Sequence, residues 1–225
     1  RDTNSYRCLD AYRRAAFDRL YDDFFYRRNN EFWKDKAMLK LPALLDSTGM
    51  LACGEDLGMI PATVPQVMDD LRILSLEIQR MPKSVEETFA HPANYPYLSV
   101  CTTSTHDMNP IRAWWEEDRE VTNQFWQMIL GNQGEAPYYC EPWICRQILE
   151  QHVWSPAMLT ILPLQDWLSM DPQLRREDPN TERINVPANS RHYWRYRMHL
   201  TLEQLASADE FNQTLADMIA ASGRK

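Results

Sequence analysis

Acidic side chains occur in two short stretches whose composition suits chemistry on neutral, polar substrates. "LACGEDLGMIP" places Glu55 and Asp56 after an apolar run and between two glycines, and "STHDMNP" places His106 and Asp107 directly after the strand candidate "YLSVCTT". Glycosidic bond cleavage needs one carboxylic acid to protonate the leaving oxygen and a carboxylate to stabilise or attack an oxocarbenium-like centre. These stretches contain the required groups, and the reaction needs no cofactor and no metal.

The elements that would position these residues alternate between strand and helix. Strands are predicted over residues 50–53, 74–79, 97–103 and 157–164, the second from its period-two alternation of apolar and polar side chains. Helices are predicted over residues 5–30, 35–49, 61–71, 110–120, 141–153 and 211–222, and residues 171–190 are predicted to form a loop. This alternation favours a parallel sheet with helical crossovers, either an open doubly wound sheet or a closed eight-fold barrel.

In a barrel of this kind the reacting groups lie at the C-terminal ends of the strands. The residues that follow the four predicted strands are Glu55 and Asp56, Gln79 and Arg80, His106 and Asp107, and Gln165 and Asp166. Structural interpretations stay open beside the catalytic one. The acidic pair of the first stretch fits a turn between Gly54 and Gly58, Asp107 fits a helix cap before Pro110, Arg80 fits a buried ion pair, and Trp114 and Trp115 fit a core.

Composition excludes several classes of function. The net charge is −8 and the pI is near 5.2, with no sustained basic stripe, so nucleic acid is not an expected partner. No apolar run approaches the roughly 20 residues of a spanning helix, so no membrane association is expected. The five cysteines are odd in number and scattered, which argues against a disulfide framework and a zinc site and favours reduced thiols in the cytoplasm. They are Cys8, Cys53, Cys101, Cys140 and Cys145.

Four motifs together resemble a known family. "ACGEDLGMIPATVPQVM" resembles the Glu-Asp-Leu-Gly motif of the amylomaltases, the 4-α-glucanotransferases of glycoside hydrolase family 77, and "TTSTHDMNPIRAWWEED" resembles their Thr-x-x-x-His-Asp motif. "LSLEIQRMP" is similar to the strand segment between them. The late stretches "PLQDWLSM" and "ERINVPANSRHYWRYR" are similar to their Gln-Asp and Arg-x-Asn-x-Pro motifs. The residues of the second and last motifs are most similar to those of the branch of this family that uses maltose.

The resemblance implies a retaining (β/α)₈ enzyme that cuts an α-1,4-glucosidic bond and passes the glycosyl unit to a sugar or glucan acceptor. It implies that Glu55 is the general acid and base, that Asp107 stabilises the transition state, and that His106 holds hydroxyls of the donor sugar. Asp56 and Asn185 fall where the family contacts sugar. Because Glu55 must be protonated to donate and ionised to accept, we expect it to be buried or to lie beside other carboxylates. The implied substrates are maltose, malto-oligosaccharides or glucans.

One part of the family pattern is missing from the sequence. The family's nucleophile is an Asp in an Arg-x-Asp-His segment, and no such segment occurs here. The chain also starts at Arg1 within a helical pattern. We therefore expect residues 1–225 to be the C-terminal portion of the catalytic domain, with strands 5 to 8 of the barrel and additional helices, and to be inactive alone. Met108 and Gly54 depart from the commoner family residues, which bears on acceptor preference more than on reaction type.

Two other functions stay open. An α-amylase-like hydrolase would use the same carboxylates with water as the acceptor, because the choice between transfer and hydrolysis depends on how well the closed site excludes water. A non-catalytic module that binds glucan or mediates oligomerisation predicts no Arg-x-Asp-His segment upstream in the parent gene. The sequence indicates neither the acceptor nor the oligomeric state.

Overall fold

The structure is a computed structural model that describes residues 2–58 and 60–224. Its contacts divide the chain into two compact units, unit 1 up to Ser75 and unit 2 from Leu76 onward. Helices and short strands alternate along the chain, which confirms the α/β class expected from the sequence. Met59, inside the first acidic motif, lies outside the described residues. None of the described helices combines the length and apolar composition of a membrane-spanning segment.

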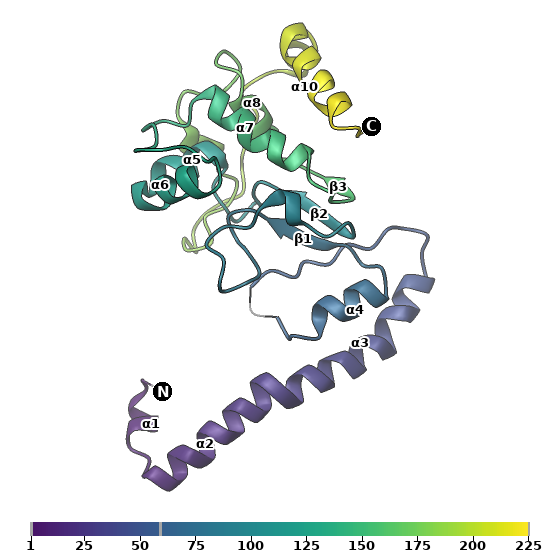
Figure 1. Cartoon of the computed structure of the whole chain (residues 1–225), viewed down its shortest axis with the longest axis vertical. Coiled ribbons are helices and arrows are strands. Elements are labelled where there is room, and N and C mark those ends of the chain that lie inside the picture. Colours follow the sequence, from purple (N-terminus) through teal and green to yellow (C-terminus); the bar gives the residue numbers. More distant parts are fainter. Residues whose placement is uncertain (1, 59, 225) are drawn as a thin grey trace. The chain divides into compact units, whose positions relative to one another are not determined.

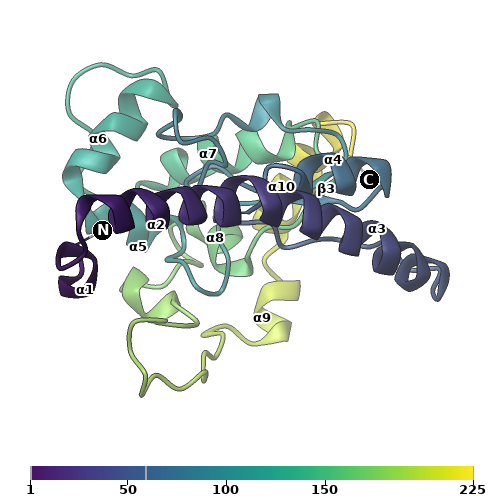
Figure 2. The same cartoon turned by 90° about the horizontal axis from the view of Figure 1, so that it is seen from below.

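Unit 1 contains one long helical run where the sequence predicts two helices. After α1 (Asn4–Arg7), α2 (Ala11–Asp23) passes through a π-helical turn, η1 (Phe24–Arg28), directly into α3 (Asn29–Asp46). Figures 1 and 2 show α2 and α3 as one uninterrupted rod. The predicted break after residue 30 is wrong, because the Asn30 amide donates to the Tyr26 carbonyl inside the helix (3.2 Å) and no residue there breaks the helix. The predicted start near Ser5 agrees with α1, whose first turn is capped by the Thr3 hydroxyl through the Tyr6 N–H (3.3 Å), but the helix is interrupted after Arg7 and restarts at α2, where the Asp10 carboxylate accepts the Arg13 N–H (2.8 Å).

The face of this run that carries the apolar residues is exposed. Its side chains Tyr12, Leu20, Phe24 and Phe32 are between 53% and 80% accessible. The aromatic rings of Tyr21 and Phe25 lie 4.7 Å apart, so neighbouring rings shield one another only in part. An exposed apolar stripe of this length is typical of a surface that packs against further polypeptide.

The rest of unit 1 is a small core that supports the first acidic motif. α4 (Val64–Asp70) has Pro65 in its first turn, as predicted, and packs Val64 and Met68 against Ile73. The strand predicted over residues 50–53 reduces to one parallel bridge, from Cys53 to Leu74. Only the backbone of residues 52–54 exchanges hydrogen bonds with Leu74, at 2.8 and 3.0 Å. The prediction was therefore right about the place of pairing and wrong about its length.

Unit 2 contains the sheet. Strand β1 (Ser75–Ile78), which starts at the boundary, and β2 (Ser99–Thr102) agree with the predictions, and the strand order is β1-β2-β3. β2 runs parallel to β3 (Leu159–Thr160), with Val100 opposite Leu159. The strand predicted over residues 157–164 is reduced to two residues, because Pro163 has no N–H to donate and already precedes a helix.

Helices in unit 2 pack around a core rich in aromatic residues, which includes Trp115, Phe125, Ile144 and Leu149. α7 lies beside α8 and α8 beside α5, an arrangement that Figure 1 shows next to the sheet. Both α7 and α10 agree with the predictions. The helices and 3₁₀ turns of this unit are η2 (Pro92–Asn94), α5 (Ile111–Glu117), α6 (Arg119–Met128), α7 (Pro142–Val153), α8 (Leu164–Ser169), η3 (Pro179–Glu182), α9 (Leu202–Ala206) and α10 (Asp209–Ala221).

The helix predicted over residues 110–120 is two helices. Asp118 has an extended backbone (φ −140°, ψ 111°), which ends α5, and its carboxylate accepts the N–H groups of Glu120 and Val121, which starts α6. Such N-capping by Asp is a strong local signal. Pro110, predicted as the first helical residue, is the residue just before the helix.

Candidate active site

Glu55 and Asp56 follow the Cys53 bridge in unit 1 and have different surroundings. Glu55 is exposed, and its Oε1 accepts the Leu57 N–H at 2.9 Å, whereas Asp56 is buried with 4% of its surface accessible. The contact to Leu57 is the kind of local bond expected for a turn. Because Glu55 is exposed, unit 1 does not itself supply the burial that an acid and base would need.

An apolar cavity of about 330 Å³ lies beside this pair, within unit 1. Its lining is otherwise made mainly of apolar side chains, among them Trp33, Leu41 and Met68. Gly54, which the sequence marked as a departure from the family, forms part of the wall, and a Cβ there would lie 2.8 Å from the Met68 Cε. An alanine at this position would therefore require the flexible end of Met68 to move.

His106 and Asp107 lie in unit 2 on the loop of residues 103–110, which connects β2 to α5. Both side chains are about half exposed, at 54% and 50%, and the His106 Nε2 lies 3.5 Å from the Asp107 Oδ2. The alternative in which Asp107 caps α5 is wrong. The Ile111 N–H at the start of that helix is instead bound by the Oδ1 of Asp166 at 2.8 Å.

Asn185 joins this pair from a distant part of the sequence. Its Nδ2 donates to the Asp107 Oδ1 at 2.6 Å, and its backbone N–H donates to the His106 carbonyl at 3.1 Å. Trp194, which sequence reasoning missed, places its ring 4.9 Å from the imidazole of His106. The signal for Trp194 was present in the stretch "HYWRYR", which was read as a motif without a role for its tryptophan. The side chains of His106, Asp107 and Asn185 thus form a polar patch beside the Trp194 ring, an arrangement suited to binding a sugar.

The segment that presents Asn185 is held by a buried ion pair. Glu182, at the end of η3, is 1% accessible, and its Oε2 lies 3.9 Å from the Nη1 of Arg112. Neither carboxylate oxygen has a hydrogen-bond partner within residues 2–58 and 60–224. Burial raises the pKa of Glu182 to about 7, against the opposing effect of the Arg112 charge.

This raised pKa predicts a pH-dependent stability. The folded state binds the Glu182 proton more tightly than the unfolded state, so its contribution is favourable near pH 4.5 and is lost as pH rises through about 7. Glu182→Gln removes the titration. We therefore expect the difference in unfolding free energy, variant minus wild type, to increase by on the order of 2–3 kcal/mol between pH 4.5 and pH 8, because only the wild type loses stability over this range. Urea unfolding across this range measures the difference. The exposed Glu177→Gln is the matched control, and parallel pH curves for wild type and Glu182→Gln would contradict the assignment.

The other residues at predicted strand ends have structural surroundings. Gln79 is buried and donates to Gln151 (2.8 Å), and Gln165 is buried and donates to the Glu182 carbonyl (3.3 Å). Asp166 is fully buried and accepts hydrogen bonds from both ends of the 103–110 loop. Arg80, expected as an ion-pair partner, donates to backbone carbonyls and stacks over Trp114 at 4.8 Å.

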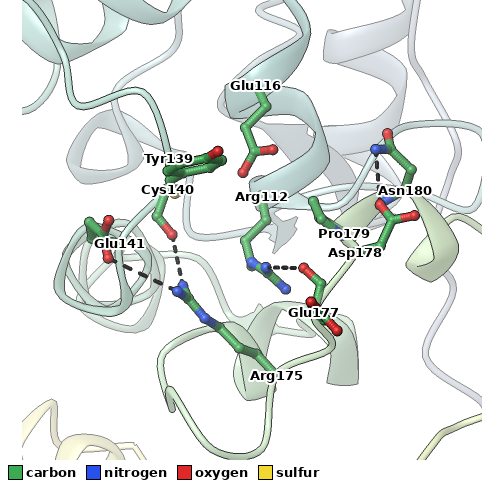
Figure 3. A pocket seen from close by; sticks show the side chains of 10 residues that line it. All are labelled: Arg112, Glu116, Tyr139, Cys140, Glu141, Arg175, Glu177, Asp178, Pro179 and Asn180. Atoms are coloured by element: carbon green, nitrogen blue, oxygen red, sulfur yellow. Dashed lines mark hydrogen bonds and ion pairs between the residues drawn. The ribbon is translucent and has the colours of Figure 1, made fainter.

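A second cavity, of about 470 Å³, lies in unit 2 and contains none of the predicted site residues (Figure 3). Both arginines that line this cavity bind to other residues of its wall. Arg175 donates to the Cys140 carbonyl at 3.0 Å and faces Glu141 at 4.0 Å, and Arg112 donates to the Glu177 carbonyl at 3.3 Å (Figure 3). Burial raises the pKa of Glu116, which faces the same space. The charges of the two arginines in this cavity are thus balanced in large part by carbonyl and carboxylate groups of the cavity wall.

The described residues contain neither a metal-ligand cluster nor a disulfide. In the described part of the chain, no three or more His, Cys, Asp or Glu side chains are grouped as metal ligands. All five cysteines are thiols, and the Sγ atoms of Cys140 and Cys145 lie 3.3 Å apart in a hydrogen bond. Burial raises the pKa of the Cys140 thiol well above its usual value, which favours the protonated form.

Comparison with known proteins places these residues in a family. The family model described as 4-alpha-glucanotransferase matches residues 5–202. The rice (Oryza sativa subsp. japonica) 4-alpha-glucanotransferase DPE2 is 41% identical over 99% of this chain and 24% of the rice protein. The Chlamydia muridarum 4-alpha-glucanotransferase is 30% identical over 93% of this chain and 40% of that protein.

Solved structures give the same fold. The amylomaltase from Streptococcus agalactiae, in complex with acarbose, superposes with a TM-score of 0.56 at 18% identity, over 76% of this chain and 32% of that one. The amylomaltase from Corynebacterium glutamicum gives 0.52 at 16% identity, over 78% and 29%. The chain thus spans between about a quarter and two fifths of these relatives. Since the family model covers most of its residues, the chain belongs to the 4-alpha-glucanotransferases of glycoside hydrolase family 77.

Proposed function

We propose that the protein containing this chain is a 4-α-glucanotransferase that cleaves an α-1,4-glucosidic bond with retention and transfers the glycosyl unit to a sugar or glucan acceptor. The observation that carries the proposal is the convergence of His106, Asp107 and Asn185 at the end of β2, with the Asn185 amide 2.6 Å from the Asp107 carboxylate. A carboxylate fixed in this way and half exposed, next to a histidine whose ring lies 4.9 Å from an indole, suits stabilisation of positive charge on a sugar.

Each residue has a separate role in this proposal. Asp107 stabilises the oxocarbenium-like transition state, and His106 donates to hydroxyls of the donor sugar. Asn185 binds sugar and also orients Asp107 through its amide. Glu55 is the general acid and base, and its exposure in unit 1 is consistent with a group that faces substrate. Asp56, its buried neighbour in the sequence, contacts sugar.

We further propose that this chain is the C-terminal portion of the catalytic domain and forms strands 5 to 8 of a (β/α)₈ barrel. Its length relative to the rice and chlamydial enzymes supports this, as does the exposed apolar face of the α2–α3 run. The nucleophile, an Asp, then belongs to the preceding half. The same proposal includes a cytoplasmic location, which the scattered free thiols support. It also includes the use of maltose, which the residues of the motifs support.

The proposal predicts different behaviour for the chain and for the complete enzyme. The complete enzyme, incubated with maltose and glycogen, should release glucose and lengthen the acceptor, while this chain alone should give no turnover because it lacks the nucleophile. Chromatography of the products measures both. Reducing sugar without longer glucans would identify a hydrolase instead, and turnover by the chain at the rate of the complete enzyme would refute its assignment as an incomplete catalytic domain.

A further inference from the structure

Two side chains outside the 103–110 loop bind both of its ends. The first is Asp166, on α8. Its Oδ2 accepts the Thr103 hydroxyl at 2.5 Å and the Ser104 hydroxyl at 3.4 Å, and its Oδ1 accepts the Ile111 N–H at 2.8 Å. One carboxylate therefore connects the end of β2 to the start of α5, on either side of Asp107.

The second is Arg80, which follows β1. Its Nε and Nη2 donate to the Thr103 carbonyl at 3.2 and 2.7 Å, and Nη2 also donates to the Asn109 carbonyl at 2.8 Å. The guanidinium carbon lies 4.8 Å from the ring centre of Trp114 on α5, which fixes its plane. Arg80 thus connects the same two ends of the loop through backbone groups.

Between these anchors the loop is bound to one distant segment and to α5. The Asn185 Nδ2 and N–H donate to the Asp107 Oδ1 and to the His106 carbonyl at 2.6 and 3.1 Å, and the Asn109 Nδ2 donates to the Glu117 Oε2 at 2.9 Å. Within the loop, the Asp107 N–H donates to the Thr105 hydroxyl at 3.3 Å. The position of the Asp107 carboxylate therefore depends both on Asn185 and on where the two ends of the loop are held.

We propose that Asp166 and Arg80 are positioning residues for Asp107, holding the loop ends at the separation that places its carboxylate for transition-state stabilisation. The inference rests on the proposed function of Asp107 and adds the residues through which the fold fixes it. A carboxylate and a guanidinium suit this task, because each has several directional bonding sites and can bind two segments at once.

Burying the charged groups of Asp166 and Arg80 costs free energy, which supports a role for them beyond filling the core. Asp166 is fully buried, and burial raises its pKa although the Thr103 hydroxyl, the Arg80 charge and the Ile111 N–H oppose the shift. Burial likewise lowers the pKa of Arg80 to about 10, and its Nη1 is buried without a hydrogen-bond partner among the described residues. Buried charges often contribute less stability than apolar groups of the same size, and what they add here is a fixed loop geometry.

The first test measures the loop itself, by amide hydrogen exchange in this chain. Thr103→Val removes one donor to Asp166 at nearly constant volume, and Thr103→Ser keeps it. We expect about tenfold faster exchange at Ile111 and Met108 in the valine variant, and near wild-type exchange in the serine variant. Thr214→Val on α10, which removes a hydroxyl bonded to the Glu210 carbonyl of the same helix at 2.8 Å, is the matched control. Equal acceleration in α7 and α10 would indicate a general loss of stability and would overturn the proposal.

The second test measures catalysis in the complete enzyme. Asp166→Ala and Thr103→Val should lower kcat by about 10- to 100-fold while KM for the donor changes little, because the misplaced group acts mainly in the transition state. Arg80→Lys should also lower kcat, since an ammonium cannot bridge both carbonyls with the same geometry. Thr103→Ser, which keeps the hydroxyl, should have near wild-type kcat. If Asp166→Ala does not fold, the comparison of Thr103→Val with Thr103→Ser still tests whether Asp166 positions the loop.

The outcomes separate this inference from the proposed function. If Asp107→Asn leaves turnover intact, the role of Asp107 fails and the positioning inference fails with it. If Asp107→Asn removes turnover while Thr103→Val and Arg80→Lys keep wild-type kcat, only the positioning inference is overturned. Faster loop exchange with unchanged kcat would overturn it as well.

Discussion

Glu55→Gln is expected to lower turnover of the complete enzyme by about 10²- to 10⁴-fold, the usual worth of a general acid and base. Glutamine is close in size but cannot donate a proton to the leaving oxygen or take one from the acceptor. Folding should be nearly unchanged, because Glu55 is exposed and glutamine keeps the carbonyl oxygen that accepts the Leu57 N–H at 2.9 Å. Initial rates of glucose release from maltose, together with thermal unfolding, measure both expectations.

A donor with an activated leaving group distinguishes an acid from a merely structural residue. Departure of fluoride from an α-maltosyl fluoride needs little protonation, so Glu55→Gln should lose far less activity toward it in the first step than toward maltose. Asp70→Asn, an exposed carboxylate on α4 of the same unit, is the matched control and should be active on both donors. Equal losses on both donors, or near-normal turnover of maltose, would refute the assignment of Glu55.

The sequence predicted the elements that are specified locally. α7 and α10 have periodic apolar residues that fill the core of unit 2, such as Ile144, Leu149 and Met218, and β2 is a short strand that is buried on both faces. The errors have identifiable physical causes. The split at Asp118 and the short helix α9, which begins with a capping box at Thr201, depend on side-chain caps that the apolar pattern does not reveal.

The candidate site was predictable only in part. His106 and Asp107 follow β2, Glu55 and Asp56 follow the Cys53–Leu74 bridge, and the types of these four residues alone suggest the chemistry. The contact between Asn185 and Asp107 joins residues 78 positions apart, and the contact between Asp166 and Thr103 joins residues 63 apart. Such pairings depend on the tertiary fold, so spacing along the chain indicated neither which residue touches Asp107 nor that Asp166 and Arg80 hold its loop.

Asp107→Asn is expected to lower kcat of the complete enzyme by about 10²- to 10³-fold with only a small change in KM, because it removes a negative charge that acts as positive charge develops on the sugar. Asparagine retains an oxygen that can accept from the Asn185 amide, so the local geometry should persist. The side chain is half exposed, and we expect little change in the unfolding temperature. Asp217→Asn, an exposed carboxylate on α10, is the matched control.

The activated donor separates this residue from Glu55. Charge develops at the sugar whether or not the leaving group needs a proton, so α-maltosyl fluoride should not restore activity to Asp107→Asn, although it should largely restore the first step in Glu55→Gln. Asn185→Ala should be milder than Asp107→Asn, since it loosens the carboxylate without removing its charge. Recovery of Asp107→Asn on the fluoride donor would mean that Asp107 acts in proton transfer, and the roles proposed for the two carboxylates would then have to be exchanged.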